Sequence, residues 1–309
     1  MVNKIYCQIE FITTLDADFG CLGISIPVIL GEFKGVLVLP ASDSLIAQDY
    51  SAHSDLLPPE EYKQLKQKSM FREWGMSYNH PPKDSWVDKA LMIIEDYGED
   101  KSLHEALDKW LVLFDIYYEL CSPNYKRNSI DNNSRKSKTK IYRIQNKGEI
   151  QHIKDDLNLV IQISISKEKT SIDETVLKKI CSLASSNMFP KMEYSILRSS
   201  FIAQRNKKYR EAVLEGATSL EVSLTSCVRS RLQLENISWA DSLIKKYQML
   251  SNLFILASTI GMTFPEGYKG LIELRNKVIH KGYAPSEKES ESFLEKVNEY
   301  VQLFSSAPY

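Results

Sequence analysis

The spacing of hydrophobic residues divides the chain into two parts, of which the first carries strand patterns. Short runs of β-branched and aromatic residues predict three separate strands, at Ile5–Ile12, Lys140–Gln145 and Leu157–Ser164. Two further runs, Ile24–Leu30 and Phe33–Leu39, flank Gly31 and predict a hairpin. Its first strand contains Pro27 and should therefore lie at a sheet edge, since proline cannot donate to a neighbouring strand on both sides.

Helical spacing interrupts the strand patterns twice in this first part. A helix is expected at Glu60–Phe71 and a second at Ser102–Leu120, where apolar residues recur every three or four positions. Between them, Trp74–Trp86 contains one glycine and two prolines, so we expect a loop there. The first part is therefore predicted to be a mixed, β-rich domain over residues 1–168.

From about Ser171 the pattern is helical to the end. Ser171 and Glu174 form a capping-box pattern that predicts a helix start. Further helices are predicted at Glu193–Arg205, at Tyr209–Leu232, from Ser238–Asp241 to Gly261, at Gly270–Lys281, and after Ser286–Glu289. The expected fold class is α+β, with an all-α bundle of five or six helices over residues 169–309 following the β-rich domain.

Composition and charge exclude several classes of protein. The 309 residues include 39 Lys and Arg against 40 Asp and Glu, and 43% are hydrophobic. Such a chain is neither disordered nor basic all over, although a local basic site is compatible with it. Five cysteines without a Cys-x-x-Cys pair fit free thiols in a reducing compartment. Without a signal-peptide pattern or an apolar run of about 20 residues, we expect a cytoplasmic protein that makes no membrane contact.

A basic segment at Asn124–Lys140 admits two interpretations. It carries several cations, among them Arg135, Lys136 and Lys138, against the single acid Asp131. Blocks of like charge usually form solvated loops. The alternative is contact with an RNA backbone, for which Arg135, Lys136 and Lys138 are the candidates.

Most chemical signatures are missing from the sequence. No phosphate-binding glycine loop, dinucleotide fingerprint or His-Glu-x-x-His pattern occurs, and no histidine has a Cys or His neighbour at metal-ligand spacing. We therefore expect neither a metal site nor a cofactor.

The predicted helix at Gly270–Lys281 carries the most informative residues. At about 100° per residue, Arg275 projects from an apolar arc, whereas Asn276 and His280 share another side one turn apart. The arc is formed by Leu271, Leu274, Val278 and Ile279. One interpretation is a structural Arg–Glu pair with an exposed histidine near the helix end. The other is a phosphate site, in which arginine offers a fork of donors and histidine titrates near neutral pH.

The order Arg275-Asn276-Lys-Val-Ile-His280 resembles the Arg-x-x-x-x-His motif, with Asn after the Arg, of the HEPN superfamily (higher eukaryotes and prokaryotes nucleotide-binding domain). Upstream, the segment from Tyr209 through Glu221 resembles the family's long helix. The resemblance covers about Met192–Phe304, which would make the C-terminal bundle a HEPN domain. The N-terminal half looks, more loosely, like the variable domain that precedes HEPN domains in the ApeA-like group.

The resemblance implies a metal-independent endoribonuclease that acts as a homodimer, with two motifs facing one cleft. His280 would be the general acid or base, Arg275 would stabilise the transition state, and Asn276 would position them or a phosphate oxygen. Glu221 would orient Arg275 through an ion pair, and the flanking Lys277 and Lys281 would contact RNA. Such enzymes commonly serve antiphage defence or toxin–antitoxin systems, so an antitoxin or a phage-derived trigger is an expected partner. The alternative is a non-catalytic HEPN module for nucleotide binding, protein binding or dimerisation.

Overall fold

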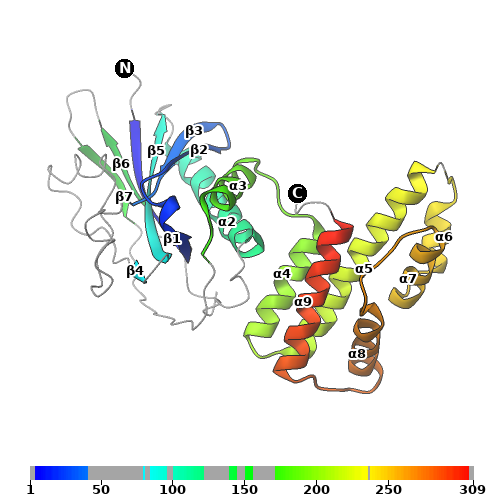
Figure 1. Cartoon of the computed structure of the whole chain (residues 1–309). Helices are drawn as coiled ribbons and strands as arrows, with labels where there is room; N and C mark the ends of the chain where they lie inside the picture. Colours follow the sequence, from blue (N-terminus) through cyan, green and yellow to red (C-terminus); the bar gives the residue numbers. More distant parts are fainter. Residues whose placement is uncertain are drawn as a thin grey trace. The chain divides into compact units, whose positions relative to one another are not determined.

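The structure is a computed structural model, and its fold class is α+β. It describes residues 4–40, 79–80, 84–95, 100–121, 139–144, 150–155, 171–235 and 237–305. These residues belong to two compact units, Met1–Phe189 and Pro190–Tyr309 (Figure 1). From the sequence, we expected the division between the domains at 168/169. The first unit extends past that point and includes the helix Glu174–Ser185.

The N-terminal unit is built on an antiparallel sheet. Its described strands follow the order β2-β3-β5-β1-β6-β7, and β4 pairs with β5 beside this path. Their bounds are Lys4–Asp18 for β1, Ser25–Leu30 for β2, Phe33–Val38 for β3, Asn79–His80 for β4, Asp84–Glu95 for β5, Thr139–Ile144 for β6 and Ile150–Asp155 for β7. The expected hairpin is confirmed, and β2, which contains Pro27, lies at the edge.

The central strand β1 shows why the sheet has a buried face. Alternate residues along it are buried, namely Ile5, Cys7, Ile9 and Phe11, followed by Leu15 and Ala17. This period of two is the signature of a strand with one face in the core. The register with β5 shifts between Glu10 and Leu15, so β1 carries extra residues there, as in a β-bulge.

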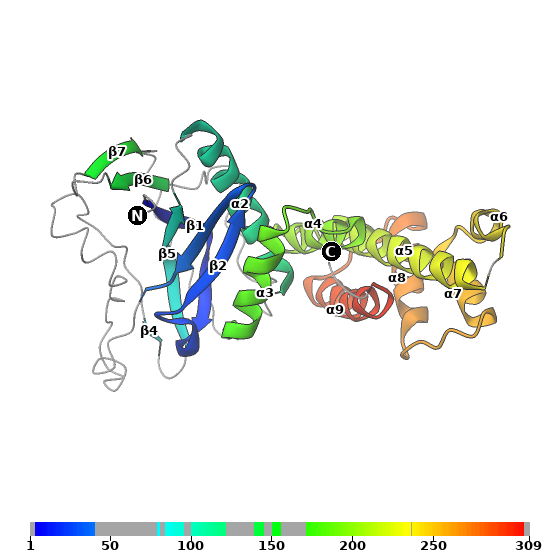
Figure 2. The same cartoon turned by 90° about the horizontal axis from the view of Figure 1, so that it is seen from above.

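Two helices cover this buried face (Figure 2): α2 at Asp100–Cys121 and α3 at Glu174–Ser185. The Phe114 ring of α2 stacks on Phe11 of β1 with ring centroids 5.0 Å apart. The Ser185 hydroxyl of α3 accepts a hydrogen bond from the Ile29 amide at 3.0 Å. Helix α3 therefore belongs to the first unit, and the boundary between the units follows it.

Three expectations for this unit need correction. The loop expected at Trp74–Trp86 contains β4 and the start of β5, because these residues pair with one another and with the far end of β1. No strand was predicted at β7. The expected cap at Ser171 is wrong: residue 172 bonds to β1 (Ile172 N to Asp16 O, 2.8 Å), so Asp173 caps α3 instead. The predicted helix at 60–71 and the predicted strand at 157–164 lie outside the described residues.

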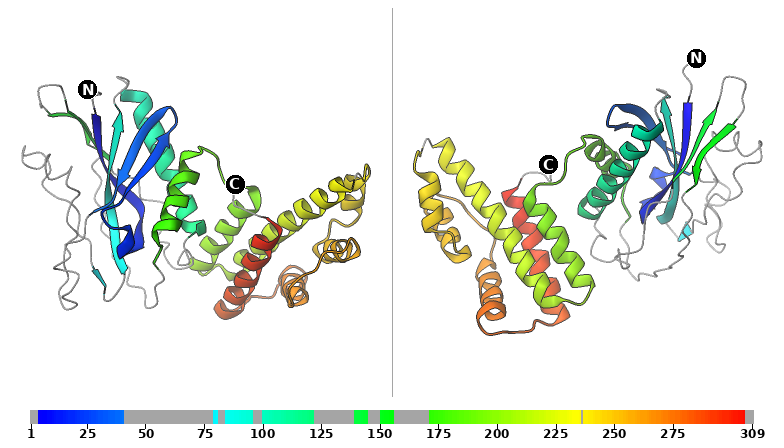
Figure 3. Two further views of the ribbon diagram at one scale, coloured as in Figure 1. Left: turned by 45° about the horizontal axis from the view of Figure 1, so that its top comes forward. Right: turned by 180° about the vertical axis from the view of Figure 1, so that it is seen from behind.

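The C-terminal unit is helical throughout its described residues (Figure 3). Its helices are α4 at Met192–Arg205, α5 at Tyr209–Leu234, α6 at Ala240–Lys246, α7 at Leu250–Thr259, α8 at Tyr268–His280 and α9 at Glu287–Phe304. Helices α4, α5 and α9 run side by side, whereas α6, α7 and α8 lie along the remainder of α5.

Small residues bring α4, α5 and α9 close together. Ser219 of α5 is fully buried, and its hydroxyl donates to the Glu193 carbonyl of α4 at 2.7 Å. Gly216 of α5 lies against Leu294 and Phe293 of α9. This close packing holds α5 rigidly, and α5 supplies one wall of the site described below.

The helix expected from Ser238–Asp241 to Gly261 is two helices. α6 ends at Lys246, and Met249 takes an extended conformation (ψ 139°) before α7 begins. Ser238 does not cap α6, since Trp239 is the N-cap and its side chain makes no capping bond. The last helix begins as expected, with a capping box of Ser286 and Glu289. No helix among the described residues is long and apolar enough to span a bilayer.

Candidate functional site

Helix α8 is fixed at its start by an aromatic cluster. Gly267 precedes it at φ +108°, a left-handed conformation that glycine adopts readily. The Tyr268 ring then stacks on Phe254 of α7, with centroids 4.7 Å apart and planes at 22°. Leu271 and Val278, which are 3% and 0% exposed, bury the same side of α8. These contacts determine which face of α8 remains open.

The end of α8 is fixed as firmly. The Tyr283 amide donates to the Lys277 carbonyl at 3.3 Å, and Gly282 supplies the left-handed residue (φ +61°) that such a helix end requires. The Tyr283 hydroxyl then donates to the Glu289 carboxylate at 2.9 Å. The hydrogen bonds that Glu289 accepts from the Ser286 amide and hydroxyl in the α9 cap, and then this one from Tyr283, lower the Glu289 pKa. The backbone that carries His280, the last residue of α8, is therefore held on both sides.

Arg275 and Asn276 form the inner part of the candidate site. Arg275 Nη1 donates to Asn276 Oδ1 at 3.1 Å, and both side chains are half-buried. A guanidinium has five N–H donors, and no carboxylate of the described residues lies within ion-pair distance of this one. His280 is exposed, and no hydrogen bond joins it to Arg275 or Asn276. Helix α8 therefore carries spare guanidinium donors at Arg275 and an accessible imidazole at His280.

Glu221 of α5 acts on Arg275 through space. Burial raises the pKa of the Glu221 carboxyl, and the positive charge of Arg275 opposes that rise. The two residues form no ion pair, contrary to the expectation from the sequence, so Glu221 offsets the arginine charge without occupying its donors.

The remaining predicted residues lie around this centre or outside the described part of the chain. Lys277 and Lys281 are exposed on either side of His280. Ile279, expected on the apolar arc, is 39% exposed, because Leu271 and Val278 direct the packed side of α8 away from it. Tyr283 is exposed beside it, at 38%. Arg135, Lys136 and Lys138 fall outside the described residues.

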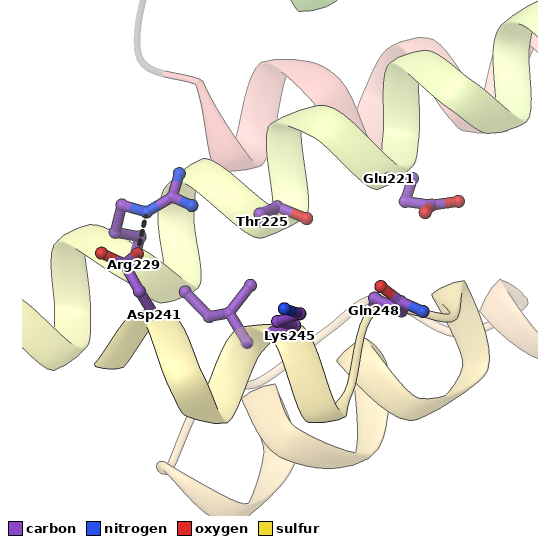
Figure 4. Close-up of a pocket in the computed structure, with 7 residues that line it drawn as sticks. Glu221, Thr225, Arg229, Asp241, Lys245 and Gln248 are labelled. Carbon is purple, nitrogen blue, oxygen red and sulfur yellow. Dashed lines mark hydrogen bonds and ion pairs between the residues drawn. The ribbon is translucent and has the colours of Figure 1, made fainter. Parts of the chain in front are cut away.

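Glu221 also lines a groove between α5 and α6 (Figure 4). It has a volume of about 490 Å³ and is open to solvent. Glu221, Thr225 and Arg229 line its α5 wall, and Asp241, Ile244, Lys245 and Gln248 line the opposite wall. Arg229 Nε donates to Asp241 Oδ1 at 2.9 Å across the groove.

The groove was not predicted from the sequence. Its α5 residues recur every fourth position, a spacing that indicates a polar stripe but does not reveal what faces it. The opposite wall exists because the chain leaves the helical path after α6, and residues 240–259 contain neither glycine nor proline to signal that break.

Comparisons with protein-family models, with curated proteins and with solved structures find no match for this chain. Among the described residues, no group of three or more His, Cys, Asp or Glu side chains could hold a metal ion.

Proposed function

We propose that the chain is an endoribonuclease of the HEPN type, which cleaves RNA through the RNA's own 2′-hydroxyl group and acts as a homodimer. The observation that carries the proposal is the half-buried Arg275, held by the Asn276 side chain rather than by a carboxylate, five residues before an exposed His280. An arginine in this state can bind a phosphate without first breaking an ion pair.

Each residue has a chemical role in this reaction. His280 takes the proton from the 2′-hydroxyl or gives one to the departing 5′-oxygen, and a pair of copies can supply one histidine for each step. Arg275 stabilises the charge that develops on the phosphorus oxygens. Asn276 holds the guanidinium in place, and the neighbouring Lys277 and Lys281 attract the RNA backbone. The products are a 2′,3′-cyclic phosphate and a 5′-hydroxyl.

The surface around His280 supports the homodimer. Ile279 and Tyr283 expose apolar and aromatic surface on either side of the histidine. A second copy that covers them would bring its own motif to the same cleft. The Ile279→Glu variant should then shift the dimer to a monomer in sedimentation experiments and lose cleavage. Ile255→Glu, on α7 and 58% exposed, is the matched control and should do neither. A wild-type monomer at micromolar concentration would contradict the shared cleft.

Cleavage is tested with purified protein and mixed RNA in the presence of EDTA. Wild type should produce 2′,3′-cyclic phosphate ends, while Arg275→Ala and His280→Ala should each lower the rate at least about a hundredfold, the usual contribution of one acid–base or charge-stabilising group. Lys269→Ala, at the exposed opposite end of α8, should cleave as wild type does. Equal cleavage by all four proteins would refute the assignment, and no cleavage with retained RNA binding would favour the non-catalytic module.

The resemblance of the α8 motif to HEPN ribonucleases also supports a role in antiphage defence or a toxin–antitoxin system. Expression of the wild-type chain alone should then slow bacterial growth, and His280→Ala should relieve the effect. If both chains slow growth equally, the toxicity does not depend on cleavage by His280.

A further inference from the structure

The groove between α5 and α6 presents polar groups one helical turn apart on two facing walls (Figure 4). Along α5, Glu221 to Arg229 spans eight residues, or about 12 Å at the rise of an α-helix. The volume of about 490 Å³ is that of many ligand sites, yet the lining is polar and open rather than apolar and enclosed. Such a groove suits a polar chain that passes along it better than a small molecule that must be enclosed.

Two cations of the groove are available to an anion. Arg229 lines the groove and uses its Nε–H for Asp241, which leaves its other guanidinium donors outside this contact. Lys245 lies on the facing wall, is exposed, and pairs with no acid among the described residues. A phosphate between these two side chains would receive donors from both walls.

Glu221 links the groove to the candidate catalytic site. Glu221 lines its end, and the same carboxyl is influenced by the charge of Arg275. Gln248 lies opposite Glu221, so an amide and a carboxyl face each other at this end of the groove. Amide and carboxyl groups of this kind bind the edges of bases. The distance from Glu221 to Arg229 exceeds the 3.4 Å rise of one stacked nucleotide, so more than one nucleotide fits.

We propose that this groove binds the single-stranded RNA next to the scissile phosphate, with a flanking phosphate held by Arg229 and Lys245. The inference rests on the proposed ribonuclease function and adds how the substrate is held. It also gives Asp241 two roles. Its carboxylate orients Arg229, and its negative charge repels the RNA backbone except where a phosphate contacts the guanidinium.

The test measures binding of a labelled single strand of about ten nucleotides, a length within the range covered by one binding domain. The strand is 2′-O-methylated throughout, so that no 2′-hydroxyl can attack. Arg229→Ala and Lys245→Ala should each weaken binding about tenfold, as expected for the loss of one charged hydrogen bond. Each should also lower the slope of log K against log salt by about 0.7, the value for one phosphate contact on a single strand. Asp241→Asn should bind more tightly than wild type.

Two matched controls come from neighbouring positions. Arg231→Ala removes an arginine on α5 that pairs with Glu235 at 3.2 Å outside the groove, and Lys246→Ala removes the exposed lysine next to Lys245. Both should keep the wild-type affinity and salt slope. A merely structural role of Arg229 would not change the salt slope, which makes that slope the decisive measurement.

The outcomes separate this inference from the proposed reaction. If wild type cleaves RNA but the groove variants match their controls in affinity and slope, the groove is refuted and the catalytic assignment stands. If wild type does not cleave RNA and the groove variants still bind more weakly than their controls, the groove holds RNA and the catalytic assignment fails. Cleavage assays on the groove variants should show a raised KM with an unchanged kcat, unlike His280→Ala.

Discussion

Gly216 holds α5 and α9 at close range, and adding a single methyl group there tests that packing. A Cβ at Gly216 would lie 2.7 Å from Leu294 Cδ2 and 3.2 Å from Phe293 Cε1. Both of these side chains are buried, Leu294 at 0% exposure and Phe293 at 3%, so neither can simply swing into solvent. The Gly216→Ala variant must therefore displace one of them or move α9.

The magnitude follows from two opposing effects. Alanine is favoured over glycine inside a helix by about 1 kcal/mol. Adding a methyl group to a packed core costs about 1–3 kcal/mol. The Gly216→Ala variant should therefore lose about 0–2 kcal/mol of stability, with α5 exchanging its amide protons faster.

Gly270 on α8 is the matched control. A Cβ there meets nothing within 4 Å, and its φ is not positive, so Gly270→Ala should be more stable by about 0.4–1 kcal/mol. The assay is urea unfolding followed by far-UV circular dichroism, with hydrogen exchange of α5 peptides to assign the change to this unit. If Gly216→Ala were stabilised as much as Gly270→Ala, the close approach of α5 and α9 would be wrong.

Two further predictions follow from titratable groups. Burial raises the pKa of the Cys7 and Cys21 thiols to about 12, from 9.0 in the open chain. At neutral pH, both thiols should therefore be alkylated about a thousandfold more slowly in the folded protein than in urea. Equal alkylation rates in the two conditions would place the thiols at the surface. The Glu221 pKa is raised in the folded protein, so the favourable contribution of its protonated form is present at acidic pH and is lost as pH rises through the folded pKa. Glu221→Gln should therefore match wild type in urea near pH 3 and exceed it near pH 7; a difference that does not change with pH would contradict this sign.

Features that depend on local pattern could be predicted from the sequence. The helices α2, α4, α5 and α9 match the expected spans within a few residues, because amphipathic spacing and end signals lie within each segment. The β2–β3 hairpin was predictable for the same reason, since Gly31 marks the turn between two apolar runs.

Features that depend on distant partners could not. The strand β5 begins in polar sequence at Asp84 and is extended because it pairs with β1, more than sixty residues earlier in the chain. The break between α6 and α7 has no local signal, and it creates one wall of the groove. In the same way, helical spacing placed Ile279 on the packed arc, but the direction in which α8 docks on α5 leaves it exposed.

The missing ion pair between Glu221 and Arg275 strengthens the argument for phosphate binding at this site. A half-buried guanidinium is costly unless something offsets its charge. Here one hydrogen bond that Arg275 donates to Asn276 Oδ1 and the distant Glu221 carboxyl provide that offset, so most N–H donors stay available. Had Glu221 bound Arg275 directly, an incoming phosphate would have had to displace it and leave a half-buried carboxylate unpaired. The observed arrangement avoids that exchange, since the phosphate would add to the existing contacts of Arg275 instead of replacing one.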